Sequence, residues 1–152
     1  MKNNLKYQQI WDKVLSTGEN VKYEFSVSDS FLKFALIANI LFSIPFMFLG
    51  GIGFIWLGIS LFVCLYYMKV ANAYAFTDKR VLIHTGWLNT NLTSVDFNKI
   101  TDVYVRQRFL DKLIIKSGDL AINTAGTNHK EIILKNIANP YEVKKILDSL
   151  KG

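Results

Sequence analysis

The chain has 152 residues, enough for one compact domain and a membrane anchor but too few for two independent soluble domains. Hydrophobic residues make up 51% of it and aromatic residues 14%, a share that is unusual for a soluble protein of this size unless the apolar residues are concentrated in one segment. The single cysteine, Cys64, excludes an intramolecular disulfide and a multi-thiolate metal site.

The net charge of +6 is unevenly distributed along the chain. Residues 72–152 carry twelve Lys and Arg against eight Asp and Glu, a balance of +4, whereas residues 1–33 contribute only +1. A cationic C-terminal part suits an anionic membrane face or an acidic partner. It is also compatible with a role in solubility alone.

The first part of the chain has the pattern of an amphipathic helix followed by a strand. The apolar stripe of the helix is formed by Tyr7, Ile10, Trp11, Val14 and Leu15. Gly18 is placed to end this helix, and residues 21–27 then alternate between apolar and polar as a half-buried strand does. The helix could lie on the membrane surface or pack on the C-terminal domain. We assign residues 1–29 to this helix and strand.

From Phe34 to Met68 the chain has no charged side chain, a run of 35 residues. Because a charge at the bilayer centre costs a few kcal/mol or more, a charge-free run of this length predicts a membrane segment. One straight helix of this length would extend about 52 Å, well beyond a hydrocarbon core of about 30 Å. The run therefore predicts two passes rather than one.

Three glycines near the middle of the run predict a sharp reversal: Gly50, Gly51 and Gly53. We expect helices near Ser30–Leu49 and Ile52–Asn72, and assign residues 30–72 to a transmembrane helical hairpin. The first apolar stretch begins about thirty residues into the sequence and lacks a small-residue cleavage pattern, so no cleavable signal peptide is expected.

Cationic residues flank the run on both sides, whereas the glycine turn carries no charge. Lys22 and Lys33 precede the first helix, and Lys69, Lys79 and Arg80 follow the second. Because short cytoplasmic segments carry the excess of Lys and Arg, we expect a multi-pass protein of the cell membrane with both termini in the cytoplasm.

Asn39 is the only amide side chain within the run, on a weakly polar stripe with Ala35 and Ser43. Such a side chain is either part of a polar pathway or bonded to a neighbouring helix. We expect a hydrogen bond across the helix pair, with the pathway as the alternative.

After residue 72 the apolar period becomes twofold. It predicts strands at Tyr74–Thr77, Arg80–Thr85, Asn91–Phe97, Ile100–Arg106, Leu120–Thr124 and Glu131–Leu134. Residues 109–114 predict a short helical turn. A last helix is expected from Pro140, capped by Asn139, and its apolar stripe should close one end or face of the sheet. Short antiparallel strands at this spacing predict a small barrel or sandwich over residues 73–152.

The C-terminal part resembles a known family over about residues 72–150. The resemblance lies in residues 74–83 (YAFTDKRVLI), 85–88 (TGWL), 94–103 (SVDFNKITDV), 105–113 (VRQRFLDKL) and 120–126 (LAINTAG). These segments, in this order, are similar to the bacterial pleckstrin-homology-like (PH-like) domain that follows paired membrane helices in small prokaryotic membrane proteins. The whole series in this order is more specific than any one segment; within it the family motif is the turn and strand that contain Thr77, Asp78, Lys79, Arg80 and Gly86.

The resemblance implies a bent antiparallel sheet system closed by a C-terminal helix, and it supplies no catalytic residues to carry over. The first hairpin lacks a clustered Lys-x-Lys/Arg loop, so the resemblance does not imply inositol-phosphate binding. The fold class expected is therefore α+β: a transmembrane helical hairpin followed by a PH-like antiparallel β-barrel or sandwich closed by a C-terminal helix.

The sequence offers no arrangement of residues for chemistry. His84 and His129 are 45 residues apart without paired cysteines, which gives a zinc site no support. Asp96, Asp102 and Asp111 fall on separate elements and do not suggest an acid–base pair. We expect no catalytic residue, no cofactor and no metal, and therefore no enzyme; a membrane enzyme remains the third hypothesis.

The densest basic set is Lys99, Arg106, Arg108, Lys112 and Lys116. It could bind acidic headgroups or an acidic segment of a partner, or it could form a solvated rim. Nucleic acid is not expected because no recognition helix or stacking motif accompanies the charge.

Together these patterns predict a membrane-anchored, non-enzymatic binding or scaffolding module at the cytoplasmic membrane face. Its expected partners are membrane lipids, other membrane proteins or a second copy of the chain. The alternative is a small oligomeric transporter or channel subunit built around Asn39.

Overall fold

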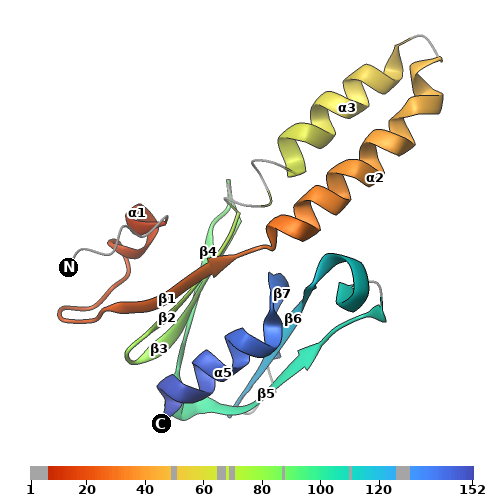
Figure 1. Ribbon diagram of the computed structural model, residues 1–152. Coiled ribbons are helices and arrows are strands. Elements are labelled where there is room, and N and C mark those ends of the chain that lie inside the picture. The colour runs from red at the N-terminus through yellow and green to blue at the C-terminus, as the bar shows by residue number, and fades with distance from the viewer. Residues whose placement is uncertain are drawn as a thin grey trace.

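Two antiparallel sheets, a pair of projecting helices and a C-terminal helix make up the computed structural model of this chain (Figure 1). The structure describes residues 7–48, 51–64, 68, 71–86, 88–109, 111–125 and 131–152. The strands are β1 (Val21–Ser26), β2 (Asn72–Thr77), β3 (Arg80–Thr85), β4 (Asn91–Asp96), β5 (Ile100–Arg106), β6 (Ser117–Thr124) and β7 (Ile132–Ala138). The helical elements are α1 (Gln8–Trp11), α2 (Asp29–Met47), α3 (Ile52–Phe62), η2 (Phe97–Lys99), η3 (Asp111–Ile115) and α5 (Pro140–Lys151).

The first sheet has the strand order β1-β2-β3-β4 and the second β5-β6-β7. All six predicted strands after residue 72 are present, and β6 and β7 are longer than predicted. The two sheets are joined where a β-bridge pairs Val27 with Ile137 and the Ser28 N–H donates to the Asn136 carbonyl at 2.7 Å. The last strand is therefore fixed to the point where the first sheet leads into α2.

The main core lies between the sheets and under α5. In β2, Tyr74 and Phe76 point into it, as the twofold alternation predicts, and both are almost fully buried. α5 packs on β5 and β6 through Val143 and Leu147, which confirms its predicted role in closing the sheets. Asn139 does stand at the start of α5, but its side chain makes no capping bond. It adopts the left-handed conformation, which Asn tolerates, and its backbone carbonyl accepts the first helical hydrogen bonds.

The N-terminal helix packs on the C-terminal domain, one of its two predicted positions. Trp11 is fully buried in a second cluster with Ala73, Ala75 and Leu82, on the face of the first sheet opposite the main core. The Trp11 Nε1–H donates to the Glu24 carboxylate at 2.7 Å, so the indole keeps a polar partner inside the cluster. The small side chains of β2 make room for this ring.

The helices α2 and α3, here called the helical arm, run antiparallel side by side away from the sheets (Figure 1). The Ser28 side chain caps α2 by accepting a hydrogen bond from the Phe31 N–H. At the far end Gly51 adopts φ +83°, a conformation that glycine allows at the reversal. Close approach of the helices needs Gly53, because a Cβ there would lie 2.6 Å from the Met47 backbone nitrogen.

The second predicted helix, Ile52–Asn72, is wrong in its extent. α3 is described from Ile52 to Phe62, and Asn72 begins strand β2, where its backbone pairs with Thr85. Of the two expected membrane spans, the described residues therefore provide one of sufficient length, α2. The prediction overran because the helix was extended beyond Met68, where the charge-free run ends, to reach the length of a full span.

Asn39 bonds within its own helix rather than across the pair. Its side-chain nitrogen donates to the Ala35 carbonyl at 2.8 Å, one turn earlier in α2. The predicted interhelical bond is therefore wrong, and the physical reason is that the amide N–H can donate to a backbone carbonyl on the preceding turn of its own helix.

The packing of the arm predicts opposite effects for the same substitution at two glycines of α3. Gly53→Ala should destabilise the arm, because the added Cβ would overlap the α2 backbone. Gly58→Ala meets no atom within 4 Å and should be neutral or stabilising by up to about 1 kcal/mol through helix propensity. Thermal unfolding of the full-length chain in detergent measures both. Equal shifts of Tm for the two variants would contradict the observed packing.

Candidate functional site: the exposed apolar and basic surfaces

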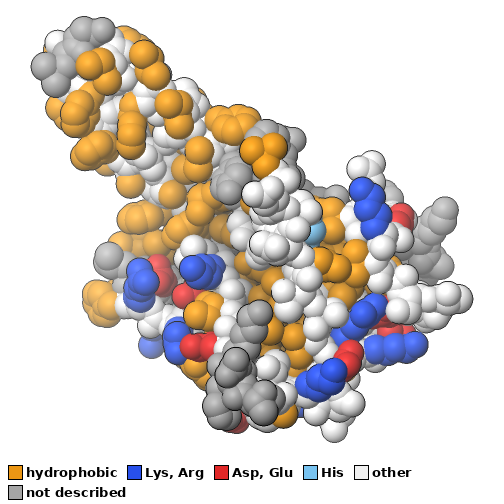
Figure 2. Space-filling view, turned by 180° about the vertical axis from the view of Figure 1, so that it is seen from behind, with side chains coloured by type: hydrophobic (Ala, Val, Ile, Leu, Met, Phe, Trp, Pro, Cys, Tyr) orange, Lys and Arg blue, Asp and Glu red, His pale blue; other side chains and the backbone are white. Residues whose placement is uncertain are grey.

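The helical arm exposes its apolar side chains instead of burying them. Sixteen large apolar residues between Phe34 and Val63 are exposed, and Leu41, Phe48 and Ile55 each expose more than 60% of their surface. Figure 2 shows this arm covered by hydrophobic side chains, whereas Lys, Arg, Asp and Glu lie on the body of the molecule. Soluble monomers do not leave a contiguous apolar surface of this size in water.

By length and composition α2 is able to cross a membrane, and it lies near the N-terminus. Only 11% of its most apolar 18-residue window is buried, unlike the core helix of a soluble protein, which is mostly buried. α3 is apolar but has 11 residues. The surface of the arm, rather than the length of α2 alone, is what distinguishes it from a core helix.

Both ends of the arm are fixed to one pair of neighbouring strands. β1 leads into α2, and β2 follows the arm; the two strands pair with Ser26 opposite Ala73. The Ser26 hydroxyl also donates to the Asn72 carbonyl. The chain thus leaves the body and returns to it at the same place.

The structure divides the five predicted basic residues. Lys99 lies just before β5, 3.4 Å from the Asp96 carboxylate, whereas Arg106 ends the same strand. A seven-residue strand extends about 23 Å, so Lys99 and Arg106 do not share one surface. Arg106 is paired with Glu131 at 2.6 Å and lies over the Tyr104 ring, whose hydroxyl also bonds to Glu131.

The other three basic residues gather in the connection between β5 and β6. Arg108, Lys112 and Lys116 are exposed there, and no carboxylate of the described residues forms an ion pair with them. The Lys112 N–H donates to the Arg108 carbonyl at 3.0 Å, which confirms the predicted helical turn. Three neighbouring cations without carboxylate partners are the arrangement expected of an anion-binding surface.

Two shallow clefts lie near the two ends of β5. One, about 310 Å³, is lined by Gln107, Lys112, Lys116 and the first turn of α5 including Glu142. The other, about 640 Å³, lies at the opposite end of β5 between Asp78, Lys79, Asp96 and Lys151. Each mixes charges of both signs. Over the described residues no three His, Cys, Asp or Glu side chains gather as metal ligands would, and the expected lack of a metal stays a prediction.

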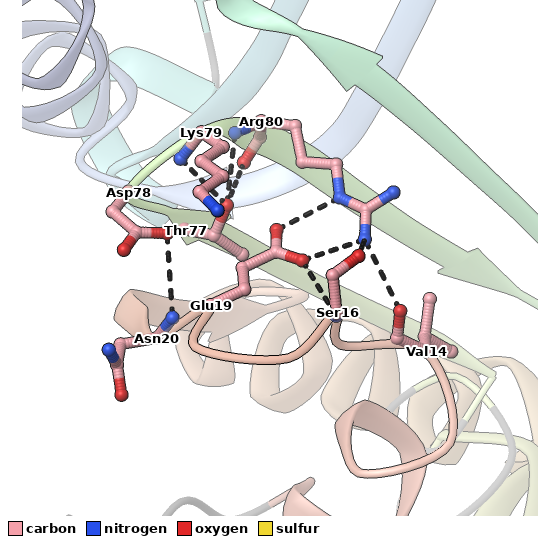
Figure 3. Close-up of polar contacts among 8 residues, drawn as sticks. All are labelled: Val14, Ser16, Glu19, Asn20, Thr77, Asp78, Lys79 and Arg80. Atoms are coloured by element: carbon pink, nitrogen blue, oxygen red, sulfur yellow. Dashed lines mark hydrogen bonds and ion pairs between the residues drawn. The ribbon is translucent and has the colours of Figure 1, made fainter.

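The family motif has a structural role (Figure 3). The Thr77 hydroxyl accepts hydrogen bonds from the N–H groups of Lys79 (3.1 Å) and Arg80 (2.9 Å), and it donates to the Arg80 carbonyl. Asp78 pairs with the backbone of Asn20. Gly86 adopts φ +95°, and a Cβ there would lie 2.0 Å from a backbone oxygen. These residues shape two turns and attach one of them to the N-terminal segment.

Arg80 of this motif forms a buried ion pair with Glu19. Its Nε and Nη2 donate to the two carboxylate oxygens at 2.9 and 2.7 Å, and the Glu19 side chain is only 1% exposed. Nη2 also donates to the Val14 carbonyl and the Ser16 hydroxyl (Figure 3). The Arg80 hydrogen bonds outweigh burial and lower the pKa of Glu19 to about 2. The guanidinium therefore ties the N-terminal segment to the start of β3.

Two other groups have shifted pKa values that reflect packing. Burial raises the pKa of the Tyr74 hydroxyl to about 12 and lowers the pKa of the His84 imidazole. His84 lies in β3, as a plain strand histidine does, and His129 lies outside the described residues.

Sequence reasoning missed two features of this surface. The first is Glu19, the partner of Arg80, which lies 61 residues away in sequence. The second is the exposure of Phe109, Leu113 and Ile114 beside the three cations. A signal for the second was present, because apolar residues recur between basic ones at helical spacing in residues 108–116.

Glu19→Gln should lower the free energy of unfolding by about 3 kcal/mol at pH 7, the value of a carboxyl pKa lowered from 4.5 to about 2. Since the folded pKa is depressed, this stabilisation is complete above pH 4.5 and is lost as the pH falls toward 2. The difference in the free energy of unfolding between wild type and Glu19→Gln should therefore shrink as the pH falls through that range. Denaturant unfolding in detergent at several pH values measures it.

The matched control is Asp148→Asn, which breaks an exposed ion pair between Asp148 and Lys144 and should change stability little. A Glu19→Gln variant as stable as wild type at pH 7, or a stability gap that does not change with pH, would contradict the role given to this pair.

Comparison with known proteins agrees with this architecture. The profile of a family described as "Bacterial PH domain" matches residues 30–151. A solved pleckstrin-homology domain from Shewanella amazonensis SB2B is similar, with TM-score 0.56 and 11% identity over 99% of this chain and 90% of that one. A DUF1696 family protein with a pleckstrin-homology domain from Shewanella loihica PV-4 has TM-score 0.53 and 12% identity over 95% and 93%. At these identities the structures show the fold. No curated protein sequence matches the chain.

Proposed function

The chain belongs to the bacterial PH domain family, and on that premise we propose that it is a membrane-anchored, non-enzymatic binding or scaffolding module. The helical arm inserts into the bilayer and holds the α+β body at the cytoplasmic face. The single observation that carries this proposal is the exposed apolar surface of the arm. In lipid that surface carries no free-energy penalty of exposure to water, whereas in water it would favour aggregation.

The dimensions of the arm fit a hairpin that crosses the hydrocarbon core and returns to the same side. α2 has 19 residues, about 28 Å of helix, close to a hydrocarbon core of about 30 Å. α3 is described over 11 residues, and the sequence stays without charge from Ile52 to Met68, 17 residues in all. The pairing of β1 with β2 supports two passes, because a single pass would separate these neighbouring strands by the membrane.

The orientation follows from the distribution of charge. All charged side chains in the sequence lie outside the run from Phe34 to Met68, and Lys33 and Lys69 flank it directly. Since β1 before the run and β2 after it pair within one sheet, the positive-inside rule favours a cytoplasmic position for that sheet. Tethering then raises the effective concentration of the domain for lipids and for other membrane proteins.

Asn39 gives the transporter alternative no support. Its side-chain nitrogen donates to the Ala35 carbonyl of its own helix, so this hydrogen bond is no sign of a polar pathway for a solute.

Charged substitutions on the arm test the proposal. Leu41 and Ile55 expose 62% and 68% of their surface, so Lys at either position would be harmless in water. In a bilayer a Lys near the midplane should cost about 3 kcal/mol, and a Lys at residue 55, four residues after Gly51, should cost less because it lies nearer the interface. We expect Leu41→Lys with Ile55→Lys to lose membrane insertion, whereas Leu41→Phe with Ile55→Phe should behave as wild type. The measurement is the fraction of full-length chain that stays in membranes after carbonate washing.

Wild type released by the carbonate wash would refute the anchor. So would a double-Lys variant that is recovered in the membrane as fully as wild type.

A further inference from the structure

The connection between β5 and β6 combines exposed apolar and basic side chains beside the helical arm. It comprises residues 107–116, of which residue 110 lies outside the described part, and is called here the β5–β6 tip. We propose that this tip enters the headgroup layer of the bilayer that holds the arm, with its apolar side chains in lipid and its cations on acidic headgroups. The proposal rests on the proposed membrane anchor and adds the lipid class that the body recognises.

The tip exposes large apolar side chains that its own fold leaves uncovered. Phe109, Leu113 and Ile114 are 75%, 60% and 62% exposed, while the adjacent Ile115 is buried. Burial of Ile115 shows that the turn is packed on the body and still directs three apolar residues outward. Apolar residues of this size on a protruding turn are typical of a group that is removed from water by a partner.

The cations are placed as an interfacial segment requires. Arg108, Lys112 and Lys116 are spaced four residues apart, next to the row formed by Phe109 and Leu113. The one acid of the tip, Asp111, leaves it with an excess of two positive charges. Amphipathic segments that lie in the plane of a membrane combine these two rows, with cations toward the acidic headgroups.

The tip lies where the arm enters the bilayer. η3 packs next to α2, and Figure 1 shows it beside the part of α2 that adjoins the sheets. On α2 the exposed apolar surface begins at Phe34, one residue after Lys33. The tip is therefore level with the polar–apolar boundary of the arm, and its apolar residues face the same medium.

The base of the tip is held in place. The Gln107 side-chain amide donates to the Ser117 carbonyl at 2.8 Å, across the two ends of the connection. Lys116 adopts φ +51°, and its carbonyl accepts from the Asn139 N–H at 3.3 Å. Since these bonds fix the turn before any contact with lipid, little ordering cost remains for binding.

Another exposed apolar residue lies near the point where the chain returns from the arm to the first sheet. Leu88, after β3, is 84% exposed, and two residues earlier in the sequence the Gly86 N–H donates to the Ala71 carbonyl, just before β2 begins. Two apolar contacts beside the arm would fix the tilt of the body on the membrane. A tether alone would leave that tilt free.

Depth-resolved fluorescence tests the proposal with the full-length chain in proteoliposomes. Cys64→Ser removes the native thiol, and a polarity-sensitive dye is then attached at Phe109→Cys or, as the control, at Ser149→Cys. Ser149 is exposed on α5, whose end lies far from the arm (Figure 1). Vesicles contain either 30% phosphatidylglycerol in phosphatidylcholine or phosphatidylcholine alone. Spin-labelled lipids quench a dye that has entered the bilayer.

We expect the dye at residue 109 to be quenched at least threefold more than the dye at residue 149 in anionic vesicles. Replacing Arg108, Lys112 and Lys116 with Ser, or omitting the anionic lipid, should remove most of that difference. The dye at residue 149 should not respond to either change.

The possible failures are distinguishable. A chain that does not co-float with vesicles refutes the anchor on which the proposal rests. A chain that co-floats while the dye at residue 109 stays as accessible to aqueous iodide as the dye at residue 149 refutes the tip alone, and would point to a protein partner for that surface. Equal quenching with and without anionic lipid refutes the headgroup assignment.

Discussion

The structure is organised around an apolar surface that has to be kept out of water. The arm formed by α2 and α3 buries little of itself: its few buried residues include Ser43, Gly53 and Ser60, while its large apolar side chains are mostly exposed. In the membrane anchor proposed above, a bilayer removes the remaining surface from water without any further protein. The body then has to receive both ends of the arm at one place, and the pairing of β1 with β2 meets this requirement.

The N-terminal segment helps to hold the strand from which the arm begins. β1 is an edge strand of the first sheet, and it leads directly into α2. Its position is secured by the buried Glu19–Arg80 ion pair on one side and by Trp11 over the outer face of the sheet on the other. Removing one partner of a buried pair leaves an uncompensated charge, so this contact couples the start of the chain to the family motif. The sheet from which the arm projects is thus braced at both ends of β1.

Local patterns in the sequence predicted much of this fold. Alternation in β2 and β3, the proline at the start of α5 and the glycine reversal in the arm each correspond to an observed element. The limits of β6 and β7 were less accurate, because Gly118 and the left-handed Asn136 interrupt the alternation. The predicted end of the second helix lay too far along the chain, since it was set by the length that a membrane span needs, whereas Asn72 already begins β2.

The site was harder to predict because it depends on contacts between distant residues. The basic set looked continuous in sequence, but β5 carries Lys99 and Arg106 to opposite ends of one strand. Glu19 could not be assigned to Arg80 by spacing, and the exposure of Phe109 depends on how η3 packs against α2. Local periodicity determines which residues share a face, whereas the medium that this face meets is decided by the tertiary fold.

The most direct measurement of the central claim is the collision rate of nitroxide spin labels on the arm of the reconstituted full-length chain. Labels at Leu41 and at the exposed α5 residue Lys145 would be compared for collisions with oxygen, which concentrates in lipid, and with a water-soluble nickel chelate. The account predicts that the label at residue 41 collides mainly with oxygen and is shielded from nickel. Nickel access at residue 41 equal to that at residue 145 would contradict it.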